Sequence, residues 1–171
     1  MTERLGAVTM KGNPLTLLGA DVKAGQAAPD FKLCANDLST LGLNAFKGKT
    51  LVISCVPSLD TPVCDLQTKR FNKETEKLGP NVSILTVSMD LPFAQKRWCG
   101  LAGVSRVLTA SDHRDASFGA AYGVLIKELR LLARAIFVVD DKGMVRYTQL
   151  VKEISSEPDY NAVLEAVKKI I

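Results

Sequence analysis

The chain has 171 residues, of which 47% are hydrophobic and 23% are charged, and its formal net charge is +4. That size and composition suit one globular domain with a sizeable core and exclude wholesale disorder. No apolar run approaches the length of a membrane span, no N-terminal stretch has the pattern of a targeting segment, and no basic stripe suggests a nucleic-acid surface. We therefore expect a cytoplasmic protein with neither a membrane nor a nucleic-acid partner.

The first predicted element is an N-terminal hairpin. Residues 7–18 alternate loosely around Gly12-Asn13, so residues 1–20 are expected to form a hairpin extension. A short strand is predicted over 31–34. Residues 50–56 form a near-continuous apolar, β-branched run, which is typical of a central strand buried on both faces.

Helices and strands then alternate. Residues 62–78 are predicted to be a helix whose apolar face is formed by Val63, Leu66, Phe71 and Leu78. A buried strand over 82–88, a helix over 92–102, a strand over 107–110 and a short helix over 116–122 follow. This alternation predicts parallel strands joined by helices that cover both faces of a sheet.

The C-terminal part adds a second hairpin and a last helix. Strands over 135–140 and 144–150 are joined at Asp141-Lys142-Gly143, a strong turn signal that predicts an antiparallel edge. Pro158 is expected in the first turn of the last helix, whose apolar positions are Tyr160, Val163, Leu164, Val167 and Ile170. Together the elements predict one α/β domain spanning 1–171.

Four cysteines are present, Cys34, Cys55, Cys64 and Cys99. In a cytoplasmic chain of this length they favour redox chemistry over a structural disulfide framework. There is no C-x-x-C, and the cysteines and the single His113 are all more than eight positions apart, so no metal site is expected. Cys34 and Cys55 lie in apolar strand-like runs and are expected to be inert.

Cys64 occupies a different setting, between a buried strand and a helix. Thr61 is a natural N-cap and Pro62 a natural first helical residue, which places Cys64 in the first turn. Backbone N–H groups without helical partners and the helix dipole favour a thiolate there. Position alone leaves open the alternative of a buried, inert cysteine.

The segment Pro57-x-x-x-Thr61-x-x-Cys64 matches the active-site motif of the peroxiredoxins. Four longer strings resemble the thiol peroxidase subfamily of atypical two-cysteine peroxiredoxins: SLDTPVC, DLPFAQKRWCG, ARAIFVVD and EPDY. The resemblance covers nearly the whole chain. It implies a thioredoxin fold, with a mixed central sheet flanked by helices and an added N-terminal hairpin, and a homodimer.

The resemblance also implies roles for residues near the helix start. Cys64 would be the peroxidatic cysteine, whose thiolate attacks a peroxide oxygen and becomes a sulfenic acid. Thr61 would hydrogen-bond the thiolate and the peroxide, and Pro57 would shield the site from water. Arg134 would stabilise the thiolate and the leaving oxygen, with Arg130 as a nearby competitor.

Cys99 would be the resolving cysteine of this family. It would form an intramolecular disulfide with Cys64, and because the two thiols lie on different predicted helices, local unwinding would be required. Gly100 and Gly103 weaken the second helix and fit that idea. The stretch 127–132 lacks the glycine usual in the family and looks shortened, which leaves substrate preference open.

The activity implied is reduction of hydrogen peroxide or organic hydroperoxides, with a thioredoxin-like dithiol protein as the recycling partner and no metal or organic cofactor. Three alternatives remain. A thiol–disulfide oxidoreductase on the same fold is disfavoured by the absence of C-x-x-C. A redox sensor and a non-catalytic binding module are the others.

Overall fold

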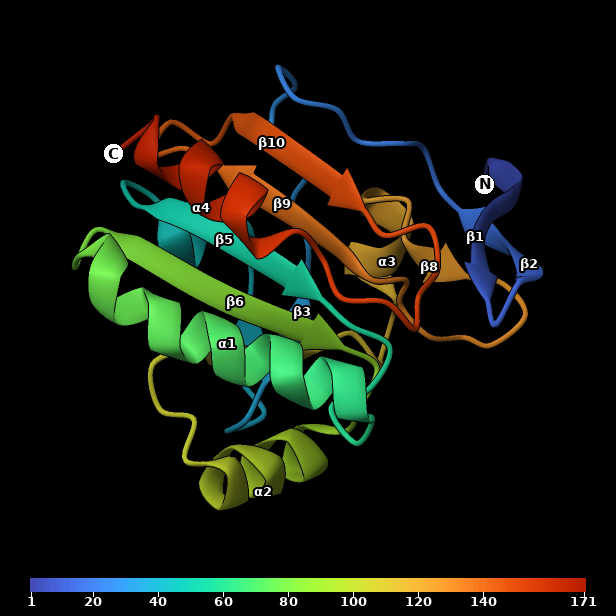
Figure 1. Cartoon of the computed structure of the whole chain (residues 1–171), viewed down its shortest axis with the longest axis horizontal. Coiled ribbons are helices and arrows are strands. Elements are labelled where there is room, and N and C mark those ends of the chain that lie inside the picture. Colours follow the sequence, from blue (N-terminus) through green and yellow to red (C-terminus); the bar gives the residue numbers. More distant parts are fainter.

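The computed structural model describes residues 1–171 (Figure 1). The strands are β1 (Glu3–Met10), β2 (Asn13–Leu18), β3 (Leu33–Ala35), β4 (Thr40–Leu41), β5 (Thr50–Cys55), β6 (Val82–Ser88), β7 (Leu108–Ser111), β8 (Leu125–Ile126), β9 (Ala135–Val139) and β10 (Val145–Leu150). The helices are the 3-10 turn η1 (Leu43–Phe46), α1 (Pro62–Leu78), α2 (Pro92–Ala102), α3 (Ser117–Ala121) and α4 (Tyr160–Lys168).

Seven strands form the main sheet in the order β10-β9-β5-β6-β7-β3-β4. β5, β6 and β7 are parallel, whereas β9 runs antiparallel to β5 and β10 antiparallel to β9. The predicted mixed sheet and its antiparallel hairpin are therefore confirmed. All six residues of β5 are buried, as expected of a strand covered on both faces.

Successive side chains of β5 point to opposite layers of the molecule. Val52 packs into the core beneath α1 and α4, together with Phe71 and Val163. Leu51 and Ile53 pack into the larger core on the other face, where α3 and the N-terminal hairpin lie. This mixed sheet with helices on both faces is a thioredoxin fold, and the α/β class is as predicted.

The N-terminal hairpin forms a sheet of its own. β1 and β2 pair around Lys11 and Gly12, both of which have positive φ, and β2 then pairs with β8. Figure 1 shows this sheet at the end of the molecule next to the β8 arrow. The hairpin starts at residue 3, earlier than the alternation from residue 7 suggested, and β8 was not predicted.

Two details of the helices differ from the predictions. The buried face of α1 comprises Cys64, Gln67, Thr68, Phe71, Glu74 and Leu78. Leu66, expected on that face, is 55% exposed, because polar side chains occupy the positions that the apolar pattern assigned to the core. Pro158 lies outside α4: Asp159 is the N-cap, and its side chain accepts a hydrogen bond from the Ala162 N–H at 3.0 Å.

None of the helices combines the length and the apolar character that crossing a membrane requires.

Candidate active site

Cys64 lies where the central strand meets α1. β5 ends at Cys55, the chain turns through a buried Pro57, and α1 starts at Pro62 behind an extended Thr61. Cys64 is the third residue of the helix and has no exposed surface. A charged sulfur at this depth needs donors, because water cannot stabilise it.

The first donor is the hydroxyl of Thr61. Its Oγ1 lies 2.7 Å from Cys64 Sγ and 2.8 Å from the Ser58 carbonyl oxygen, so its single proton can be given to either acceptor. Thr61 stands at the predicted N-cap position, but its side chain caps no backbone N–H. The expectation that this hydroxyl caps the helix was therefore wrong. The hydroxyl faces the Cys64 sulfur instead.

The second donor is the guanidinium of Arg134, the residue just before β9. Its Nη2 lies 3.4 Å from Cys64 Sγ, its Nη1 donates to Gln67 Oε1 at 2.7 Å, and its Nε donates to the Ile154 carbonyl at 2.9 Å. Only 2% of Arg134 is exposed. Arg130 is exposed, so the structure brings Arg134, not its competitor, to the sulfur.

Gln67 holds this arginine in place and was not predicted. Its amide group accepts from Arg134 and donates through Nε2 to Ser54 Oγ at 2.7 Å, and the side chain is fully buried. Ser54 lies on the same face of β5 as Val52, toward α1. The only sequence signal was its place three residues after Cys64, one helical turn along the same face.

Asp90, at the end of β6, anchors the loop before α1. Its carboxylate accepts hydrogen bonds from Ser58 Oγ at 2.7 Å, from the Leu59 N–H at 2.8 Å and from Ser88 Oγ at 2.7 Å. Asp90 begins the DLPFAQKRWCG string and was not predicted as a site residue. Its position at the carboxyl end of a parallel strand was the available signal.

A small apolar cluster covers the sulfur. Val56, Leu59 and Cys64 are buried together, and the half-buried Trp98 of α2 packs against them. The Trp98 indole N–H donates to Asp65 Oδ1 at 3.1 Å. This cover keeps water away and strengthens the two hydrogen bonds that reach Cys64.

Cys99 does not contact Cys64 in this structure, and all four cysteines are free thiols. Cys99 lies in α2, half-buried, with Sγ 3.5 Å from Thr109 Oγ1, and it packs against the core beneath α1 and α4. Of the five predicted residues, Thr61 and Arg134 contact Cys64, Pro57 is buried in the loop that leads to α1, and Cys99 is on a neighbouring element.

Cys34 and Cys55 are both buried. The Cys55 thiol lies 3.3 Å from the Ala133 carbonyl and 3.2 Å from the Ala135 carbonyl. These two residues flank Arg134 in the sequence. Burial raises the pKa of Cys55 to about 12. Cys55 is therefore a neutral thiol at physiological pH, as expected of an inert cysteine.

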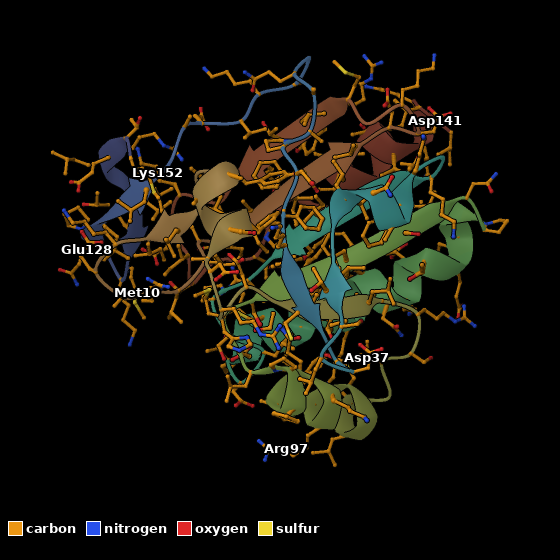
Figure 2. The ribbon with its side chains drawn as sticks, turned by 180° about the vertical axis from the view of Figure 1, so that it is seen from behind. Met10, Asp37, Arg97, Glu128, Asp141 and Lys152 are labelled. Carbon is orange, nitrogen blue, oxygen red and sulfur yellow. The ribbon has the colours of Figure 1, made fainter.

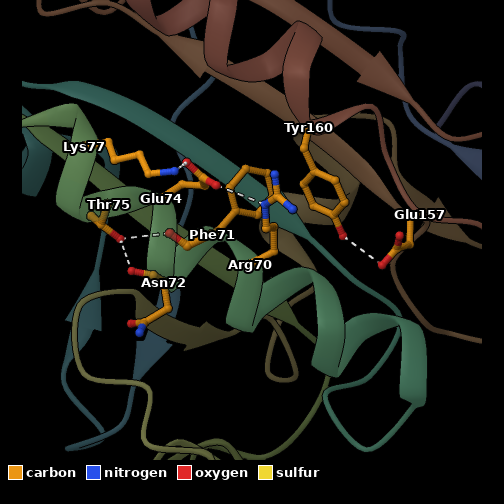
Figure 3. Close-up of polar contacts among 8 residues, drawn as sticks. All are labelled: Arg70, Phe71, Asn72, Glu74, Thr75, Lys77, Glu157 and Tyr160. Atoms are coloured by element: carbon orange, nitrogen blue, oxygen red, sulfur yellow. Dashed lines mark hydrogen bonds and ion pairs between the residues drawn. The ribbon is translucent and has the colours of Figure 1, made fainter.

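Further along α1 from Cys64, a polar cluster connects α1 to α4 (Figure 3). The buried Glu74 pairs with Arg70 at 3.0 Å and Lys77 at 3.2 Å, and the Arg70 guanidinium lies 5.4 Å from the centre of the Tyr160 ring. Burial alone would raise the pKa of Glu74, but the hydrogen bond and charge of Lys77, with the charge of Arg70, hold it below the ordinary value. The cluster fixes α1, and with it Cys64, against α4.

A cavity of about 420 Å³ lies away from this site. Its lining includes Lys49, where β5 begins, and Asp140, where β9 ends. It therefore lies at the opposite end of β5 from Cys64. The chemistry is concentrated instead at the covered junction of β5 and α1.

The geometry is that of a buried nucleophile: a sulfur aligned by a hydroxyl and a guanidinium and shielded from water. A match to the Redoxin family covers residues 23–164. The thiol peroxidase of Oceanobacillus iheyensis is 58% identical over 162 residues, 95% of this chain and 98% of the relative, and that of Bacillus subtilis is 52% identical over 167 residues, 98% and 99%.

Solved structures are similar as well. A peroxiredoxin-like protein from Aquifex aeolicus superposes with a TM-score of 0.90 at 43% identity, over 98% of this chain and 99% of that one. A thiol peroxidase from Chromobacterium violaceum superposes with a TM-score of 0.85 at 20% identity, over 95% of each chain, which is a likeness of fold.

Proposed function

The chain belongs to the thiol peroxidase family of the peroxiredoxins, a family of thiol-dependent peroxidases, and we propose that it reduces peroxides through Cys64 and Cys99. One observation carries the proposal. Thr61 Oγ1 and Arg134 Nη2 both point at Cys64 Sγ, from 2.7 and 3.4 Å. No other cysteine of the chain has a cationic donor at its sulfur.

In the first step, the Cys64 thiolate attacks one oxygen of hydrogen peroxide or of an organic hydroperoxide. The O–O bond breaks, the sulfur becomes a sulfenic acid, and the other oxygen takes up a proton and leaves as water or an alcohol. Arg134 and Thr61 stabilise the thiolate before the reaction and the leaving oxygen during it. Pro57 and the apolar cluster limit competing water.

In the second step, the Cys99 thiolate attacks the Cys64 sulfur, and the sulfenic hydroxyl leaves as water. The product is an intramolecular disulfide, which a thioredoxin-like dithiol protein reduces by thiol–disulfide exchange. Cys99 is half-buried, whereas the other three cysteines are buried. It is therefore the most accessible cysteine for disulfide formation and for reduction by the partner protein. We place the cycle in the cytoplasm, where such reductants act, and in a homodimer.

The experiment is peroxide consumption with thioredoxin, its reductase and NADPH, followed by a peptide map after one equivalent of peroxide. Cys64→Ser is expected to abolish turnover. Cys55→Ser is the matched control, because its hydroxyl can make the same carbonyl hydrogen bonds and turnover should persist. The map should show Cys64 linked to Cys99; a bond to Cys34, or one between chains, would refute the pairing.

Peroxide stoichiometry, insulin reduction and light scattering separate the remaining alternatives. A sensor would consume one equivalent of peroxide per chain and stop, whereas a peroxidase turns over. A thiol–disulfide oxidoreductase would reduce insulin faster than it reduces peroxide. Light scattering after size exclusion tests the homodimer.

A further inference from the structure

Asp65 and Trp98 are the immediate neighbours of the two proposed redox cysteines. Asp65 follows Cys64 in α1, Trp98 precedes Cys99 in α2, and the Trp98 N–H donates to Asp65 Oδ1 at 3.1 Å. This is the sole side-chain hydrogen bond between α1 and α2. The indole also packs on both sides, against the cluster around Cys64 and against the core that Cys99 touches.

The two halves of α2 differ in their contacts with the rest of the protein. In its first half the buried Gln95 donates to Ser88 Oγ at 2.9 Å and to the Ala110 carbonyl at 3.0 Å. In its second half Leu101 is 83% exposed, and the helix ends at Gly103 in the left-handed region. Figure 2 shows Arg97 projecting outward from this helix, away from the body of the protein. In the half that carries Cys99, Cys99 and Ala102 pack on the core beneath α1 and α4, and Trp98 makes the one side-chain hydrogen bond to α1.

The first half of α2 has a second anchor close by. Asp90, two residues before Pro92, binds the loop that leads to Cys64, and the Ser111 hydroxyl donates to the Asp90 carbonyl oxygen. These contacts can stay in place while the second half of α2 unwinds. The hinge then falls between Gln95 and Trp98.

We infer that the Trp98–Asp65 hydrogen bond is a latch that must open before Cys99 can reach Cys64. The inference rests on the proposed function, in which the Cys99 thiolate displaces the sulfenic hydroxyl of Cys64 as water. Trp98 and Asp65 act as positioning residues. While the latch is closed, the sulfenic acid persists, and a second peroxide molecule can oxidise it to sulfinic acid with release of water. Latch strength therefore sets the partition between disulfide and sulfinic acid.

The test measures disulfide formation by rapid mixing with peroxide, thiol blocking and mass spectrometry. Trp98→Phe keeps an aromatic ring and loses the N–H donor, and Asp65→Ala removes the acceptor. Both should form the disulfide on the order of tenfold faster than the wild type, since hydrogen bonds to charged groups are the stronger ones. Asp65→Asn, whose amide oxygen still accepts, should lie between. The peroxide-dependent first step is recorded for each variant, so the two steps are read separately.

Lys69→Met is the matched control. Lys69 Nζ pairs with the other oxygen of the same carboxylate at 2.9 Å, so this change removes a partner of Asp65 but leaves the Trp98 bond. Its rate and its sulfinic acid yield should equal those of the wild type. In excess peroxide, Trp98→Phe and Asp65→Ala should yield less sulfinic acid than the control, because faster disulfide formation leaves less sulfenic acid to oxidise.

A double variant completes the test. If the latch is one bond, Trp98→Phe combined with Asp65→Ala should be no faster than either alone. Unchanged disulfide rates in both single variants, or fully additive effects, would overturn the latch while leaving the proposed cycle intact. A wild type that forms no Cys64–Cys99 disulfide would instead overturn the proposed function. If Asp65→Ala does not fold, Trp98→Phe and Asp65→Asn carry the comparison.

Trp98 is also the only tryptophan of the chain, so its fluorescence reports on the latch directly. In the wild type the emission should change with the disulfide-forming step. A change that follows only the peroxide-dependent step would overturn the inference.

Discussion

Arg134 and Cys64 are separated by 70 positions in the sequence, yet Arg134 Nη2 lies 3.4 Å from Cys64 Sγ. The contact exists because β9, which Arg134 precedes, lies beside β5, whose end leads to Cys64. The pairing of Cys55 with Ala135 brings the two chain segments side by side. The sheet therefore brings Arg134 to the site, and the hydrogen bond from its Nε to the Ile154 carbonyl helps to orient the guanidinium.

Arg134→Lys should lower the second-order rate constant for hydrogen peroxide by about 100-fold. Lysine keeps the charge but not the three fixed N–H directions that reach the sulfur, Gln67 and the Ile154 carbonyl. Stopped-flow mixing with peroxide measures the effect, and circular dichroism checks the fold. Arg130→Lys is the control and should react as the wild type does. A loss of less than threefold at Arg134 would argue against its role.

Gln67→Leu should lower the free energy of unfolding by about 1–3 kcal/mol, because it leaves Ser54 Oγ and Arg134 Nη1 buried without a partner. The peroxide rate should fall too, since the guanidinium loses one of its three restraints. Urea denaturation and the stopped-flow assay measure the two effects. The neighbouring Leu66→Ala, at a side chain that is 55% exposed, should change stability by no more than about 0.5 kcal/mol.

Asp90→Ala should release the loop before α1. Ser58 Oγ and the Leu59 N–H lose their acceptor, so amide hydrogen exchange over residues 58–61 should accelerate and the peroxide rate should fall. Mass spectrometry of deuterated peptides locates the change. Protection that is unaltered in this loop would show that Asp90 does not hold it.

Glu153 should contribute to stability in a defined pH range. The Ser155 hydroxyl and the Gly12 and Lys11 N–H groups lower the pKa of Glu153 from 4.5 to about 2. Because the folded pKa is the lower one, this contribution is complete above the unfolded value and is lost as the pH falls toward 2. Glu153→Gln should flatten the dependence of Tm on pH between about 2 and 4.5.

The control for that experiment is Glu165→Gln, which changes an exposed carboxylate on α4 that accepts no side-chain hydrogen bond. It should leave the pH dependence of Tm as in the wild type. If Glu153→Gln and Glu165→Gln gave the same curve, the Glu153 contacts would not contribute as described.

The bounds of α1 and α2 could be predicted from the sequence because residues that start and end helices mark both ends of each. Pro62 and Pro92 occupy first helical positions, and Gly79 and Gly103 follow the last ones. β4 and β8 were missed because two residues are too few to produce a period.

Spacing in the sequence accounts for the prediction of Thr61 and Cys64, and the family resemblance for that of Arg134, whereas Gln67 and Asp90 were not predicted. Thr61 and Cys64 are one helical turn apart, so spacing alone placed them together. Gln67 was missed because its partner Arg134 is 67 positions away, and polar residues on a buried helix face contradict the apolar pattern that assigned Leu66 to the core. That contradiction is itself typical of functional sites.

The N-terminal hairpin lies outside residues 23–164, the part that matches the Redoxin family. Yet Glu153 holds the hairpin turn through the Lys11 and Gly12 N–H groups, and the next residue, Ile154, supplies the carbonyl that receives Arg134 Nε. A chain shortened to the family segment would retain all five predicted site residues and lose the brace behind the arginine. We therefore expect the hairpin to contribute to the reactivity of Cys64, although it lies outside the segment that matches the family.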